Sequence, residues 1–193
     1  MDNEYHIPEL NNFINRNVNP IHSQSNDLMQ KYLLLHALVY YFEYAVGAVR
    51  SQERALQNKY TDAEIVSSAI AAYVFMRNCL GLADKIISKF GVKNTKRLDQ
   101  HKELISNIKD VRNRFIHPNE DENRDSDKEW WVISKRKMIS TDGRIVIPQK
   151  FILQPKDSRD IELYPRKDLE KLRQYLKDFT YVVANLFYKK LEN

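Results

Sequence analysis

The strongest constraint on the fold is a helical spacing of apolar residues that continues for about eight turns near the N-terminus. Between residue 28 and about residue 58, apolar residues recur every three or four positions, as they do along one face of an α-helix. They are Leu28, Tyr32, Leu35, Leu38, Phe42, Ala45 and Val49. A strand would alternate apolar and polar residues instead. The spacing therefore predicts one long helix with a single buried face.

A second helix is predicted from residue 61 to residue 90. Thr61 and Glu64 are spaced as a capping box, in which each side chain accepts a hydrogen bond from the backbone of the other residue. Gly91 follows the last apolar residue and is typical of a left-handed C-terminal cap.

Two further helices are bounded by prolines. The third is predicted from near Thr95 to Pro118, because the residue before a proline is displaced from the α region. The fourth begins at Pro165, a residue suited to a first helical turn, and continues nearly to the C-terminus. Four long helices predict an all-α protein built as a four-helix bundle.

The pattern changes between the third and fourth helices. Residues 119–129 contain six acidic and two basic residues and no large apolar one, which predicts a surface loop. Residues 130–140 are rich in β-branched and aromatic types, and Asp142-Gly143 is a typical two-residue hairpin turn before a partner strand at 144–147. We therefore expect a β-hairpin insertion, to which residues 151–153 could add a third strand.

The length of 193 residues fits one globular domain. We divide it into an N-terminal arm (1–27), the first three helices (28–118), the acidic loop with the hairpin (119–164) and the C-terminal helix (165–193). Four apolar residues of the arm are expected to pack against the bundle: Ile7, Leu10, Phe13 and Ile14.

We expect a cytoplasmic protein without a membrane-spanning segment. The longest uninterrupted apolar run, residues 69–76, is far shorter than the roughly 20 residues that cross a bilayer. The first 25 residues lack the basic cluster and apolar stretch of a secretory signal. Cys79 is the only cysteine, cannot form a disulfide within the chain, and is expected to lie in the core.

The basic residues are concentrated in the C-terminal third of the chain. Residues 130–193 carry 14 Lys and Arg against 8 Asp and Glu, a net charge of +6, whereas residues 1–129 carry 17 against 18. This asymmetry is compatible with a polyanionic partner such as RNA, although a solvated lysine-rich face is the commoner explanation.

The segment most informative about function lies at the end of the third predicted helix. Arg112 follows Ile108 by four residues and so continues an apolar stripe, where a guanidinium needs an anion. His117 precedes a proline, so its ring can lie beyond the helix end and fold back toward Arg112. The Asn113 amide lies one residue further round and can hold the imidazole or a substrate hydroxyl.

Such a cluster suits the cleavage of an RNA phosphodiester. An imidazole with a pKa of about 6.5 can take the proton of a 2′-hydroxyl at neutral pH, and Arg112 can stabilise the charged phosphorane. The alternative is structural: Arg112 pairs with a carboxylate on another helix, such as Glu43 or Asp84, and His117 caps the helix.

This helix order and motif resemble the HEPN superfamily, a four-helix fold found in many prokaryotic ribonuclease toxins and defence proteins. The resemblance covers about residues 28–190 and rests on the Arg-polar-x-x-x-His pattern, here Arg112-Asn113-Arg114-Phe115-Ile116-His117. It implies a metal-independent endoribonuclease whose two copies face one cleft, with Arg112 and His117 catalytic and Asn113 as a polar assistant. The loop and hairpin at 119–164 match no general family pattern, and many members of the family bind without cutting.

Further basic residues are candidates for binding RNA: Arg114, Lys135, Arg136 and Lys137. The run at 135–137 lies close to Trp130 and Trp131, whose rings could stack on bases. A hairpin edge protected by lysines explains the same run.

No metal or other cofactor is expected. The segment from Asp121 imitates the start of a calcium loop, but Ser126 replaces the required glycine and Val132 replaces the bidentate glutamate. The other histidines lack metal-ligand spacing.

The sequence thus predicts a homodimeric endoribonuclease that leaves a 2′,3′-cyclic phosphate, with RNA and an antitoxin protein as partners. Two alternatives remain open. One is a non-catalytic module that binds RNA or a nucleotide, and the other is a helical domain that binds a protein partner.

Overall fold

The computed structural model describes residues 7–18, 26–58, 60–93, 95–116, 145–147 and 161–191. Most of them belong to four long helices: α2 (Asn26–Gln57), α3 (Asp62–Phe90), α4 (Lys102–Ile116) and α5 (Pro165–Leu191). The prediction of an all-α protein is confirmed for this part of the chain, to which only one short pair of strands is added.

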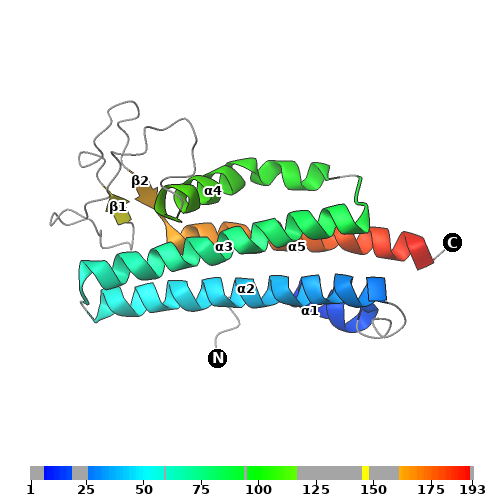
Figure 1. Ribbon diagram of the computed structural model, residues 1–193, viewed down its shortest axis with the longest axis horizontal. Helices are drawn as coiled ribbons and strands as arrows, with labels where there is room; N and C mark the ends of the chain where they lie inside the picture. The colour runs from blue at the N-terminus through cyan, green and yellow to red at the C-terminus, as the bar shows by residue number, and fades with distance from the viewer. Residues whose placement is uncertain are drawn as a thin grey trace.

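Helices α2 and α3 lie side by side and antiparallel, and α5 packs along α3 (Figure 1). Their inner faces meet in one apolar core. Its largest fully buried side chains from these three helices are Leu35, Leu38, Tyr73, Met76, Leu80, Ile86, Tyr175 and Phe179. The spacing of three and four residues seen in the sequence is therefore the spacing of the buried face.

Both predicted caps of α3 are present. The hydroxyl of Thr61 accepts a hydrogen bond of 3.4 Å from the backbone N–H of Glu64. The Glu64 carboxylate accepts one of 2.9 Å from the backbone N–H of Thr61. At the other end Gly91 has φ of 67°, a left-handed conformation that an L side chain rarely adopts.

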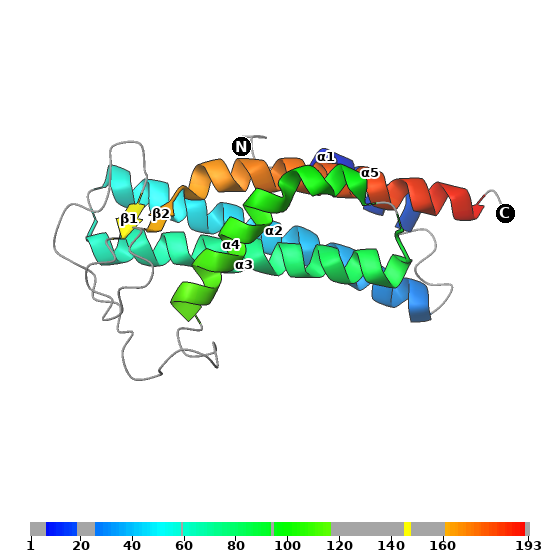
Figure 2. The ribbon, with the colours of Figure 1, turned by 90° about the horizontal axis from the view of Figure 1, so that it is seen from above.

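The third predicted helix is two elements rather than one. A 3₁₀-helix, η4 (Lys96–His101), comes before α4. Side chains three residues apart eclipse one another in a 3₁₀-helix, so Arg97 and Gln100 extend in the same direction, toward α5. Both bind the same carboxylate there, Asp178, and this contact is the physical reason for the tighter turn. Figure 2 shows that α4 then crosses α3, and that its C-terminal end projects past α3 on the side opposite α5.

The N-terminal arm is partly helical. Helix α1 (Pro8–Phe13) continues into one π-helical turn, η2 (Ile14–Val18), and packs against α5. The predicted packing of its apolar side chains is confirmed, because Ile7, Leu10, Phe13 and Ile14 are all buried.

Two strands of three residues each pair in antiparallel fashion, β1 (Ile145–Ile147) and β2 (Ile161–Leu163), with Ile145 opposite Leu163. The predicted strand at 144–147 coincides with β1, whereas β2 was not predicted. The predicted partner strand at 130–140, its Asp142-Gly143 turn and the strand at 151–153 lie outside the described residues. The hairpin insertion therefore stays a prediction.

The composition of helix α3 is relevant to whether the chain spans a membrane. By length and composition alone, Ala63–Phe90 is long and apolar enough to span a bilayer. The core helix of a soluble protein passes the same test, so this observation is weak evidence. The absence of a membrane-spanning segment and the cytoplasmic location stay predictions.

Candidate functional site

The predicted catalytic residues lie at the C-terminal end of α4. The backbones of Arg112, Asn113 and Arg114 belong to the last turns of this helix, while their side chains lie outside the described part of the structure. All of His117 lies outside it as well, as does the basic run at 135–137. The convergence of Arg112 and His117 stays a prediction, and so does the alternative pairing of Arg112 with a carboxylate.

Helix α4 presents an apolar stripe to α3, as the sequence predicted. Leu104, Ile108 and Val111 are buried, and Ile105 packs at the margin of the core. Arg112 follows the fully buried Ile108 by four positions in the same helix. The stripe fixes the part of α4 that leads into the motif.

A buried carboxylate fixes the other end of α4. Asp178 in α5 accepts hydrogen bonds of 2.7 Å from Nε of Arg97, 2.8 Å from Nε2 of Gln100 and 2.9 Å from Nε2 of His101. The Asp178 side chain is only 2% exposed, and His101 also packs edge-on against Tyr175. We call Asp178 and these three partners the Asp178 clamp.

The partners of Asp178 also determine its charge state. Burial alone would raise the pKa of this carboxyl, but hydrogen bonds from His101, Arg97 and Gln174 together with the charge of Arg97 lower it below the ordinary aspartate value. Asp178 is therefore a carboxylate at neutral pH, held in place by donors from η4 and from its own helix. The clamp holds η4, and with it the start of α4, against α5.

A second polar contact joins α3 to the first turn of α5. The hydroxyl of Tyr73 donates a hydrogen bond of 2.6 Å to Oδ2 of Asp168 and accepts one of 3.0 Å from the backbone N–H of Tyr164. Burial raises the pKa of Asp168, and the hydrogen bond from Tyr73 and the nearby charges of Lys171 and Lys167 only partly offset this effect. Burial also raises the pKa of Tyr73, so its hydroxyl stays protonated and donates.

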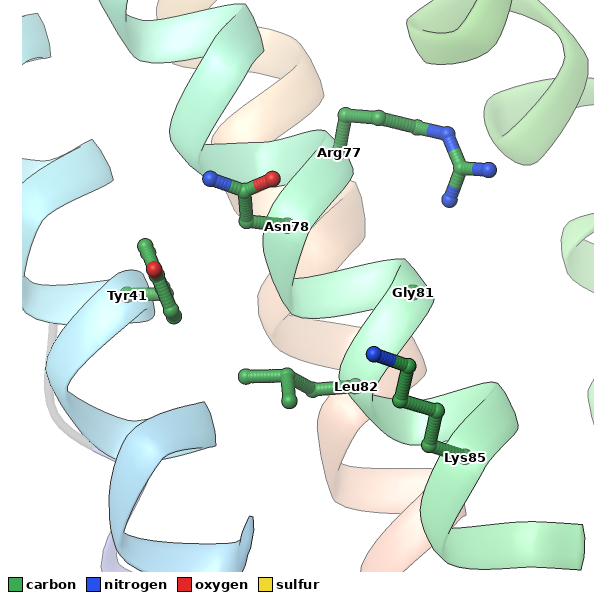
Figure 3. Close-up of a pocket in the computed structure, with 6 residues that line it drawn as sticks. All are labelled: Tyr41, Arg77, Asn78, Gly81, Leu82 and Lys85. Atoms are coloured by element: carbon green, nitrogen blue, oxygen red, sulfur yellow. The ribbon is translucent and has the colours of Figure 1, made fainter.

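The structure also has a pocket of about 310 Å³ between α2 and α3. Its lining residues are Tyr41 from α2 and Arg77, Asn78, Gly81, Leu82 and Lys85 from α3 (Figure 3). We call it the Gly81 pocket. Two of the six lining residues are cationic, none is acidic, and Gly81 has no side chain.

Aromatic rings continue from this pocket along α2. Tyr41 and Tyr44 lie with their ring centroids 6.2 Å apart, and Phe75 of α3 lies 5.4 Å from the ring of Tyr44. Tyr40 and Tyr44 are each 55% exposed.

The Gly81 pocket was not predicted from the sequence. The signal was present in the spacing, since Arg77, Gly81 and Lys85 recur every four residues and so lie along one face of α3. It was overlooked because the apolar stripe of the same helix was the stronger pattern.

The described residues contain no cluster of three or more His, Cys, Asp or Glu side chains that could hold a metal ion. Cys79 is a free, buried thiol whose pKa is raised by burial, as expected for a core residue rather than a nucleophile or ligand.

Comparisons with models of protein families, with curated proteins and with solved structures find no match to this chain.

Proposed function

We propose that this protein is a metal-independent endoribonuclease with an HEPN-like arrangement of four helices. The observation that carries the proposal is the sequence spacing of Arg112 and His117, which stands five residues later and directly before a proline, at the end of an amphipathic helix. This spacing suits an arginine that binds phosphate and an imidazole that moves a proton.

In this mechanism the imidazole of His117 takes the proton from a 2′-hydroxyl of the RNA. The 2′-oxygen attacks the adjacent phosphorus while Arg112 neutralises the charge that develops on the phosphoryl oxygens. The bond from phosphorus to the 5′-oxygen breaks, and that oxygen takes up a proton. The products are a 2′,3′-cyclic phosphate and a 5′-hydroxyl. Asn113 orients the imidazole or the substrate hydroxyl.

A homodimer completes the proton transfers. One chain supplies one His117, whereas phosphodiester transfer benefits from both a base and an acid. A second copy of the motif facing the same cleft supplies the second imidazole. Arg114 and the basic run at 135–137, within a β-hairpin insertion, bind the RNA around this cleft.

The Asp178 clamp and the apolar stripe of α4 support this proposal. Catalysis needs reacting groups held to within fractions of an ångström, and rigid elements do this better than loops. Helix α4 is fixed at its start by the clamp and along its length by Leu104, Ile108 and Val111.

A second candidate function is RNA binding without cleavage. The Gly81 pocket favours it, because its cations Arg77 and Lys85 do not belong to the Arg112 and His117 motif. Under this alternative His117 is dispensable.

In the cell, an antitoxin protein would be the partner of the proposed ribonuclease, and the cytoplasm would be its location.

The experiment that tests the proposed function is cleavage of single-stranded RNA in the presence of excess EDTA. Cleavage should continue unchanged, and the 3′ ends should carry a 2′,3′-cyclic phosphate. Cleavage that stops on chelation and returns with magnesium would show a metal-dependent nuclease instead. Binding without any cleavage would support the second candidate.

A further inference from the structure

We infer that the Gly81 pocket binds a phosphate group of single-stranded RNA, with Arg77 and Lys85 as its cationic ligands, and that the neighbouring tyrosines of α2 stack on an adjacent base. The inference rests on the proposed function and extends it, since it gives the RNA a binding site apart from the motif.

Arg77, Gly81 and Lys85 are spaced four residues apart along α3 and so lie on one face of the helix. Gly81 has no side chain, and a Cβ built at this position would lie 3.4 Å from Nη1 of Arg77. The guanidinium therefore lies over the turn that contains Gly81. Figure 3 shows that the amine of Lys85 extends back toward the same turn from the other side. The two cationic groups thus lie near the same turn of α3, at a residue without a side chain.

The charges of the pocket suit an anion. Its polar lining residues are Arg77, Lys85, Asn78 and Tyr41. Among the ion pairs that join described residues, none includes either cation. Asp84 does interact electrostatically with Arg77, although partial burial raises the pKa of that carboxyl. A phosphodiester oxygen between the two cations would receive hydrogen bonds from both.

The rings next to the pocket favour a single strand over a duplex or a free phosphate. Tyr41 belongs to the pocket and is in contact with the ring group of Tyr44 and Phe75. Stacking on exposed rings requires unpaired bases, which a duplex does not offer. Cations beside exposed aromatic rings are the combination that binds single-stranded nucleic acid.

The position of the pocket agrees with its use by the same RNA chain. In Figure 3 helix α5 lies behind α3, so the pocket opens on the side of α3 away from α5. The C-terminal end of α4, which carries the backbone of Arg112, projects past α3 on that same side (Figure 2). The pocket and the C-terminal end of α4 therefore lie on the same side of α3.

The test uses the double variant Arg77→Gln with Lys85→Gln. The control is Lys171→Gln with Lys177→Gln, which removes the same charge from exposed positions on α5. The probe is a labelled, short, single-stranded 2′-O-methyl RNA, which cannot be cleaved by attack of its 2′-oxygen. Its dissociation constant is measured by fluorescence anisotropy over a series of salt concentrations.

The pocket variant should raise the dissociation constant about fivefold or more and reduce the slope of its logarithm against log salt by about 1, because one phosphate loses both of its cationic ligands. The control should stay within about twofold of the unaltered protein. Gly81→Glu, which keeps both cations and places a carboxylate between them, should weaken binding as well. This third variant keeps the test decisive if the double variant unfolds.

Four outcomes would overturn the inference. Equal weakening by the pocket variant and the control would show a diffuse charge effect. A pocket variant that becomes monomeric in light scattering would assign this face to contact with a second copy. Undiminished binding by the pocket variant and by Gly81→Glu, in a protein that still cleaves RNA, would reject the pocket as an RNA-binding site and leave the proposed function intact. Failure of the unaltered protein to bind any RNA would reject the proposed function together with the pocket.

Discussion

Nε2 of His101 lies 2.9 Å from Oδ2 of Asp178, a carboxylate buried in α5. This pair joins two residues that are 77 positions apart in the sequence and fixes the point where η4 becomes α4. The backbones of Arg112 and Asn113 lie at the far end of the same helix, so the pair fixes the start of the helix that carries the proposed motif.

Asp178→Asn should lower the free energy of unfolding at neutral pH by about 1–3 kcal/mol, because the largely buried His101 and the half-exposed Arg97 both lose a charged acceptor. Urea denaturation measures the change. The matched control is Glu170→Gln, an exposed partner of Arg166 at 3.4 Å, which should change stability by less than about 0.5 kcal/mol. Equal effects of the two substitutions would contradict the role given to the clamp.

The same variant gives a pH dependence with a definite sign. The folded-state pKa of Asp178 is below its ordinary value, so its contribution to stability is complete above the pKa of the unfolded aspartate, about 4, and is lost as the pH falls through the lower folded value. The stability difference between the unaltered protein and Asp178→Asn should therefore shrink below about pH 4. A difference that grows on acidification would have the wrong sign.

Tyr73→Phe should lower the free energy of unfolding by about 1–2 kcal/mol, since it leaves Asp168 and the backbone N–H of Tyr164 without this partner. Thermal or urea denaturation measures it. Tyr181→Phe removes a hydroxyl from an exposed ring and should be nearly neutral. If the two variants are equally stable, the hydrogen bonds of the Tyr73 hydroxyl contribute nothing to the free energy of unfolding.

The predicted homodimer is tested by light scattering at tens of micromolar. The proposed mechanism needs an acid as well as a base, so the active species should have twice the mass of the chain. A monomer that cleaves RNA at full rate would contradict the shared cleft.

The boundaries of the helices were predictable because local chemistry sets them. The capping box of Thr61 and Glu64, Gly91 and Pro165 each act within one or two turns, and the structure has α3 and α5 where these residues put them. The break between η4 and α4 was not predictable, because its cause is Asp178, which lies far away in the sequence. Strand β2 was missed because three residues are too few for alternation to be visible.

The two candidate sites also differ in how far the sequence alone could predict them. The motif at Arg112 and His117 is a local pattern that the sequence displays, while its side-chain geometry stays a prediction. The Gly81 pocket required the structure, because Tyr41 of α2 reaches the α3 cations only through the packing of the two helices.

Arg112→Ala separates the catalytic and structural interpretations of the motif. If Arg112 is free to bind phosphate, its removal should weaken both RNA affinity and cleavage and should leave the melting temperature unchanged or higher. Melting curves measure the effect on the fold. A loss of about 3–5 kcal/mol, as expected for breaking a buried ion pair, would favour the pairing of Arg112 with a carboxylate such as Glu43 or Asp84.

The most direct test of the proposed function is the RNA cleavage rate of His117→Ala, measured together with its affinity for uncleavable RNA. The imidazole acts on a proton in the transition state, so cleavage should fall by at least about a hundredfold while the dissociation constant stays within about threefold. A His117→Ala protein that binds RNA and cleaves it at the original rate would contradict the assignment of His117 as the catalytic base.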